Sequence, residues 1–101
     1  MKLENYTPHT INISGVRVPS YGIYARCEEI TQYVFEIDGI QFVKKTYGKV
    51  VGLPDKEDGV MYIVSMMVRQ ALPNRNDLAS PGDIIRDEYG QIIGCLNLVI
   101  N

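Results

Sequence analysis

The sequence predicts a mainly β protein, a small barrel- or sandwich-like sheet with one short helix after the central strand. Short apolar runs, alternating or continuous, recur along the chain with turn residues between them. Asp38-Gly39 joins two of these runs, and only "MMVRQAL" (66–72) carries apolar residues at helical spacing. With 101 residues and no internal repeat, we expect a single domain over residues 1–101.

The first half of the chain is rich in strand patterns. "TINIS" (10–14) alternates and leads through a glycine turn into the short run 16–18. "GIYARCEEI" (22–30) is typical of the next strand, with Tyr24, Arg26 and Glu28 on one of its faces. The run "YVFEIDGIQFVKKTY" (33–47) predicts a hairpin that turns at Asp38-Gly39, because both residues tolerate the positive φ that a tight hairpin needs.

The second half contains the buried strand and the helix. A short strand is expected at Val50–Val51, and after a loop "VMYIVS" (60–65) has the composition of a buried strand. The helix over 66–72 follows directly, with Ser65 as its N-cap and Pro73 at its end.

The C-terminal region predicts a loop and a second hairpin. The polar segment "PNRNDLASPGD" (73–83) is expected to be a long loop, and "IIRDEYGQIIGCLNLVI" (84–100) a hairpin turning near residues 88–90 with a long last strand. That last strand is largely apolar, and an exposed edge of this kind invites aggregation unless it is paired. We therefore expect a homo-oligomer.

Composition excludes several classes of function. The net charge is −2 and no basic block is longer than Lys44-Lys45, so we expect no binding to duplex nucleic acid. No apolar run is long enough to span a bilayer, and the N-terminus lacks an apolar signal region. We therefore expect a cytoplasmic protein with no membrane partner.

The cysteines and the single histidine argue against a metal or a cofactor. Cys27 and Cys95 are far apart in the sequence, and each lies in an apolar strand pattern typical of a free buried thiol. The chain has no CxxC motif and no second histidine, so neither a metal site nor a bound cofactor is expected.

Three polar segments are candidates for a ligand site. In "TPHT", Pro8 stiffens the backbone, so Thr7 and His9 are either fixed donors to an anion, ribose or base, or ordinary turn residues. Ser65 begins the helix, where free N–H groups favour an anion, although a cap alone explains a serine there.

The third segment is the polar loop. Arg75 is placed to clamp a phosphate and Asp77 to accept from ribose hydroxyls, although Asn and Asp in such a loop also form turns of their own. Arg26 and Tyr47 are further candidates. Arg26 is either solvated or paired with a nearby carboxylate, and Tyr47 either frames a pocket or lies at the edge of the core.

The order of the motifs "N-x-TPH-x-IN", "TYGKVVGLP", "YIVS", "RND-x-x-SPGD" and "RDEYGQIIGC" resembles an uncharacterised family of small phage, prophage and bacterial proteins. The resemblance covers most of the chain and implies no established activity. Small phage proteins of this kind often bind rather than catalyse, for example by sequestering the nucleotide signals of bacterial immunity.

We therefore expect a non-enzymatic protein that binds a nucleotide-type small molecule through Thr7, His9, Ser65, Arg75 and Asp77, with Arg26 and Tyr47 as outer contacts. Two alternatives stay open. One is a protein–protein interaction or structural module that uses the tyrosines and an edge strand. The other is a small nucleotide-processing enzyme with His9 as general base, oriented by Asp77 or Asp83.

Overall fold

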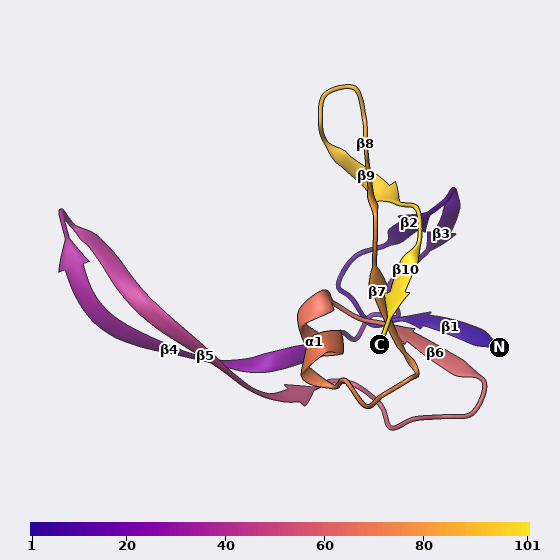
Figure 1. The fold of residues 1–101 in the computed structure, drawn as a ribbon, viewed down its shortest axis with the longest axis horizontal. Helices are drawn as coiled ribbons and strands as arrows, with labels where there is room; N and C mark the ends of the chain where they lie inside the picture. The colour runs from indigo at the N-terminus through magenta and orange to yellow at the C-terminus, as the bar shows by residue number, and fades with distance from the viewer.

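Ten strands and one helix form two four-stranded sheets and a separate two-stranded hairpin in the computed structural model, which describes residues 1–101 (Figure 1). The mainly β fold with one short helix is confirmed. The elements are β1 (Lys2–Asn5), β2 (Ile11–Ile13), β3 (Val16–Val18), β4 (Arg26–Ile37), β5 (Ile40–Val51), β6 (Val60–Ile63), α1 (Met66–Ala71), β7 (Leu78–Pro81), β8 (Ile84–Arg86), β9 (Ile92–Cys95) and β10 (Leu98–Ile100).

The core lies in the sheet with strand order β1-β6-β7-β10. Strands β1, β6 and β7 are parallel to one another, and α1 connects β6 to β7. Ile63 and Val64 are fully buried, as the predicted buried strand requires, because parallel strands flanked by a crossover are covered on both faces. The sheet therefore contains a parallel β6-α1-β7 unit, to which β1 adds a third parallel strand.

Aromatic rings fill the space around this sheet. The Tyr6 ring packs edge-on against Tyr62 at a centroid distance of 5.3 Å and stacks on Tyr21 at 5.1 Å. Val68 of α1 and Leu78 of β7 complete the same apolar cluster. Burial raises the pKa of both Tyr6 and Tyr62, so both phenols stay neutral over the physiological range.

The second sheet has the order β3-β2-β9-β8 and consists of two short hairpins. They meet through a parallel pair in which Ile13 lies beside Cys95. The Asn12 amide also donates to the Ile93 carbonyl at 3.3 Å. Gly94 permits this approach, since a Cβ atom at that position would meet the Asn12 carbonyl oxygen.

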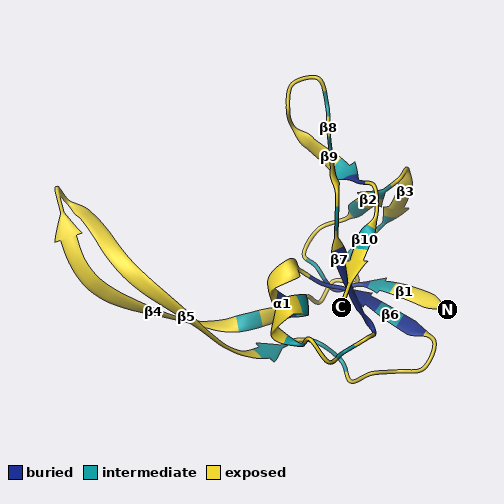
Figure 2. Cartoon of the chain, viewed as in Figure 1, coloured by how far each residue is buried: buried dark blue, intermediate teal, exposed yellow.

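Strands β4 and β5 form a long hairpin that projects from the rest of the molecule, and we call it the arm (Arg26–Val51) (Figure 1). Asp38 and Gly39 have φ values of 52° and 79°, which confirms the predicted turn. Each strand has twelve residues, so the arm is about 40 Å long at the usual rise per residue. Figure 2 shows it exposed along nearly its whole length.

The structure differs from the sequence prediction in several places. Strand β1 was not predicted, and the strands expected at 22–30 and 50–51 are parts of the long arm strands. Two further differences lie in the C-terminal region. Strand β7 lies inside the segment expected to be a loop, because its buried run of Leu78, Ala79 and Ser80 is too short to stand out between polar residues. The expected long last strand is divided into β9 and β10, which belong to different sheets. Asn97 lies at the break, where its side chain accepts from the Asp83 N–H at 2.9 Å and donates to the Asp83 carboxylate at 3.1 Å.

The chain contains no helix with the length and apolar character needed to cross a bilayer.

Candidate functional site

A cavity with a volume of about 750 Å³ lies at the base of the arm, and we call it the arm-base cavity. Its walls come from three separate parts of the chain: the base of the arm, the N-terminal turn and the junction between β6 and α1. This volume lies in the usual range for small-molecule sites, roughly 300–1,000 Å³. The residues that carry its chemistry are Pro8, Tyr24, Arg26, Glu28, Glu29, Tyr47, Ser65 and Met67.

Three of the seven predicted site residues line this cavity: Arg26, Tyr47 and Ser65. Thr7 and His9 do not line it themselves, but Pro8 between them does. The structure therefore brings the arm, the N-terminal turn and the helix start to one place, although they are distant in the sequence.

Arg26 is the free cation of the arm-base cavity. Its guanidinium lies 5.6 Å from the centroid of the Tyr24 ring. It forms none of the ion pairs of the structure, and none of the side-chain hydrogen bonds starts from it. Because all of its N–H donors are available, the side chain is able to bind an anion in a bidentate geometry.

The two carboxylates that line the cavity differ in whether a lysine neutralises their charge. Glu29 accepts from Lys45 at 2.7 Å, and this hydrogen bond raises the pKa of the lysine. The positive charge of Lys45 thereby balances Glu29. Glu28 forms no ion pair, so the cavity presents one free carboxylate beside one free guanidinium.

The N-terminal turn is held by a buried asparagine that the sequence analysis missed. The Asn5 amide donates to the His9 carbonyl at 2.8 Å and to the Val18 carbonyl at 3.0 Å. Its oxygen accepts from the Thr7 N–H at 2.9 Å, and the Thr7 hydroxyl lies 2.6 Å away. The Thr7 hydroxyl is thus used inside the turn, and its role there is to fix the backbone that places Pro8 in the cavity wall.

Ser65 has the predicted capping role. Its hydroxyl oxygen accepts from the Val68 N–H at 3.2 Å, at the start of a helix of only six residues. The oxygen is thereby occupied as an acceptor, but the hydroxyl proton has no acceptor among the side-chain hydrogen bonds. Ser65 is therefore able to contribute one donor to a molecule in the cavity.

Arg75 and Asp77 are located outside the arm-base cavity and bind each other. Arg75 donates from Nε and Nη2 to the two Asp77 oxygens at 2.9 and 2.6 Å, and from Nη1 to the Pro54 carbonyl at 3.1 Å. The Asp77 hydrogen bond raises the pKa of Arg75, and the same bond lowers the pKa of Asp77. With the guanidinium fork filled by Asp77, neither side chain is free for a phosphate or a ribose.

The rest of the polar segment 75–83 is also engaged within the protein. Buried Ser80 accepts from Arg69 Nε at 2.7 Å, and Asn76 accepts from Lys56 at 2.6 Å. Packing explains the polar Ser80, because a polar group buried beside β7 needs a partner, whereas Asn76 is exposed and its bond to Lys56 lies at the surface.

Among the side chains of the cavity that the site prediction missed, Tyr24 and Glu28 had a signal in the sequence. The alternation of "YARCE" places both on the same face as Arg26, and that pattern was a signal for their shared location. No group of three or more His, Cys, Asp or Glu side chains is arranged to hold a metal ion. No family model, curated protein or solved structure matches this chain.

Proposed function

We propose that this chain is a non-enzymatic binding protein that holds a phosphorylated, nucleotide-type small molecule in the arm-base cavity. The observation that carries the proposal is the Arg26 guanidinium, which has no ion-pair partner and lies beside the Tyr24 ring, in a cavity of ligand size that Tyr47 also lines. A cation without an internal partner, next to aromatic side chains, suits a ligand that combines an anionic group with a flat ring.

Each group has a role in this proposal. Arg26 binds a phosphate through two parallel N–H donors. Tyr24 and Tyr47 offer rings on which a base stacks, a contact contributing about 1–3 kcal/mol per base in single-stranded nucleic-acid complexes. Glu28 accepts from a ribose hydroxyl or an exocyclic amine, and Ser65 donates its hydroxyl proton. A nucleotide has a partner for each of these groups: a phosphate for the cation, a hydroxyl or amine for the carboxylate and a base for the rings. This favours a nucleotide over a simple anion.

The proposed biological role is sequestration of a nucleotide immune signal in the cytoplasm of a bacterial cell. It is supported by the resemblance of the TPH, GLP, YIVS and SPGD motifs to small phage proteins. Two of these motifs contribute to the arm-base cavity, Pro8 from the first and Ser65 from the third.

Calorimetry with a panel of cyclic dinucleotides, cyclic ADP-ribose compounds and mononucleotides tests the proposal. We expect one of these probes to bind and Arg26→Gln to weaken its affinity by roughly tenfold or more, because a charge-assisted hydrogen bond contributes about 1.5–3 kcal/mol. Arg17→Gln is the matched control, since Arg17 is exposed on β3 and forms no ion pair.

Two results contradict this function. If no nucleotide in the panel binds, the cavity has another ligand class or none. If the bound probe is recovered as a different molecule after denaturation, the protein is an enzyme. The form of the enzyme alternative that uses Asp77 has little structural support, since both oxygens of Asp77 accept from Arg75 and are not free to orient His9.

A second candidate function, a protein–protein interaction module, is favoured by the arm. Its apolar side chains are exposed far from the core (Figure 2). Co-purification of one host protein in a fixed ratio, without a bound small molecule, supports this function over ligand binding.

A further inference from the structure

The exposed surface of this chain is larger than that of a typical compact monomer of the same mass. Its accessible area is 7234 Å², whereas a monomeric protein of this mass exposes about 5,800 Å². Its radius of gyration is 16.2 Å, against about 13 Å for a compact domain of this length. Only 13 of the 101 residues are buried, so the core is small for the length of the chain.

Nine of the 24 large apolar side chains that are exposed in this chain lie on the arm. Phe35 pairs with Phe42 and Ile37 with Ile40 across the two strands, and alternation places all four on one face. The two phenylalanine rings stack at 4.9 Å, yet each side chain of the set is 43–64% exposed. We call this set the arm tip.

The arm gains little support from the rest of its own chain. A two-stranded hairpin is only marginally stable in water unless a third strand or a helix packs on it. In this chain α1 packs against β4, but both four-stranded sheets exclude the arm strands. A partner available whenever the chain folds, at the same concentration, is another copy of the chain.

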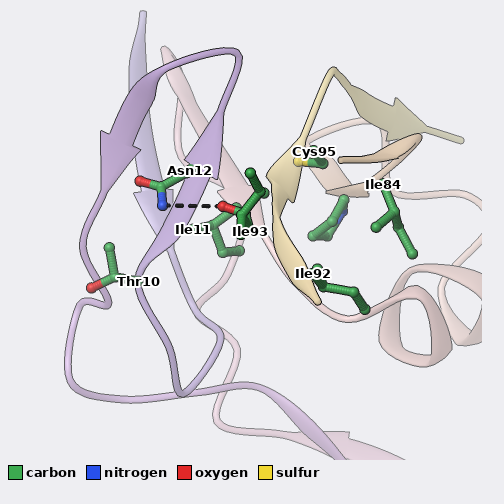
Figure 3. Close-up of a pocket in the computed structure, with 9 residues that line it drawn as sticks. Thr10, Ile11, Asn12, Ile84, Ile92, Ile93 and Cys95 are labelled. Carbon is green, nitrogen blue, oxygen red and sulfur yellow. Dashed lines mark hydrogen bonds between the residues drawn. The ribbon is translucent and has the colours of Figure 1, made fainter. Parts of the chain in front are cut away.

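The same chain carries an apolar surface at a different end. A hollow of about 590 Å³ lies between the β2–β3 and β8–β9 hairpins, and its apolar side chains include Ile11, Ile84, Ile92 and Ile93 (Figure 3). We call it the aliphatic groove. Three of these isoleucines, Ile84, Ile92 and Ile93, are more than half exposed. The arm projects away from the groove, so the two surfaces do not meet within one chain (Figure 1).

We propose that the arm tip of one copy docks in the aliphatic groove of a second copy of this chain. Exchange of arms between two copies related by a twofold axis covers both tips and both grooves in a closed assembly. The excess area, about 1,400 Å² per chain, amounts to nearly 3,000 Å² for two chains, within the range of obligate homodimers, about 2,000–5,000 Å². The polar Asn12 and Thr10 form part of the groove wall, and the aliphatic side chains receive the phenylalanine rings.

Sedimentation equilibrium of the full chain tests the contact with three variants. Phe42→Asp alters the arm tip, Ile92→Asp alters the groove, and Gln41→Asp is the control, since Gln41 directly precedes Phe42 and lies on the opposite face of the same strand. We expect the wild type and the control to have at least twice the mass of one chain, and each of the other two variants to fall to the mass of one chain.

A mixture of the two disrupted variants separates this contact from others. In this mixture Ile92→Asp keeps an intact arm tip and Phe42→Asp keeps an intact groove. We therefore expect part of the material to regain the mass of two chains. A monomeric wild type overturns the proposal. An Ile92→Asp variant that keeps the wild-type mass also overturns it, because the tips then associate with each other or with another surface.

Cysteine cross-linking keeps the test decisive if a charged variant fails to fold. Ile37→Cys and Ile92→Cys are prepared as separate full-length variants in a Cys27→Ala, Cys95→Ala background, because both native cysteines are free and Cys95 lines the groove, and they are mixed in oxidised glutathione. We expect a disulfide between the two variants in the mixture and no cross-linked product from Ile92→Cys alone. Absence of the mixed disulfide, with both thiols titratable in the folded protein, overturns the proposal independently of the binding of any nucleotide.

Discussion

Single buried side chains decide which polar residues are free to act. Asn5 is 1% exposed and makes four contacts that hold the N-terminal turn, although nothing in its sequence context distinguishes it from a surface asparagine. Arg26 and Arg75 were both candidates for binding an anion. The two arginines differ in their burial and in the pairing of Arg75 with Asp77, and both properties depend on the tertiary structure.

The Arg75–Asp77 pair is the clearest structural contribution of a single side chain. We expect Asp77→Asn to lower the free energy of unfolding by about 3 kcal/mol at neutral pH, because it leaves a largely buried guanidinium without its counter-charge. Urea unfolding measures this loss. Asp58→Asn is the control, since Asp58 is exposed and forms no ion pair, and an equal loss in both variants contradicts the assignment.

The same pair predicts a pH dependence. The hydrogen bond from Arg75 holds the pKa of Asp77 below its ordinary value of about 3.9. A carboxylate whose pKa is lower in the folded state stabilises the protein above its unfolded pKa, and this contribution is lost as the pH falls through the folded pKa. We expect unfolding free energies measured below about pH 4 to converge between the wild type and Asp77→Asn.

Among the elements, those with local signals were predictable. The hairpin turn at Asp38-Gly39, the buried strand at 60–65 and the helix capped by Ser65 follow from residues within a few positions of one another. Strand β1 and strand β7 were missed, because each is four residues long and acquires its hydrogen bonds from β6, which is distant in the sequence. The predicted hairpin covered only residues 33–47, with 22–30 and Val50–Val51 expected as separate strands. Neither the full length of the arm nor its projection from the body was therefore predicted.

The base of the arm depends on one glycine. Gly52 has a φ of +82°, and a Cβ atom there meets the carbonyl oxygen of Tyr24. We expect Gly52→Ala to destabilise the protein by about 1–3 kcal/mol more than Gly59→Ala. Gly59 has a similar φ of +77° but open space around it, so both variants share the strain and only one has the clash. Thermal unfolding measures the difference, and equal effects rule out a close approach at Tyr24.

At the scale of the whole molecule, the small core and the long arm have different origins of stability. Buried residues of β6 and β7 are covered within one chain, whereas the arm depends on the proposed second copy. We expect hydrogen exchange of arm peptides to accelerate on dilution, while exchange of peptides from β6 and β7 keeps its rate. Equal behaviour of both regions at every concentration contradicts a separate source of stability for the arm.

Tyr47 and Phe42 lie on the same strand, one in the wall of the arm-base cavity and the other at the far end of the arm. Strands β4 and β5 are hydrogen-bonded along their length. A change of tilt at the base of the arm therefore moves its tip, and both ends share one angle relative to the rest of the chain. A ligand that favours one angle changes the association constant of the two copies. Because linkage is reciprocal, association of the copies changes the affinity for the ligand by the same factor. Ligand binding and association of the copies then both depend on the angle of the arm.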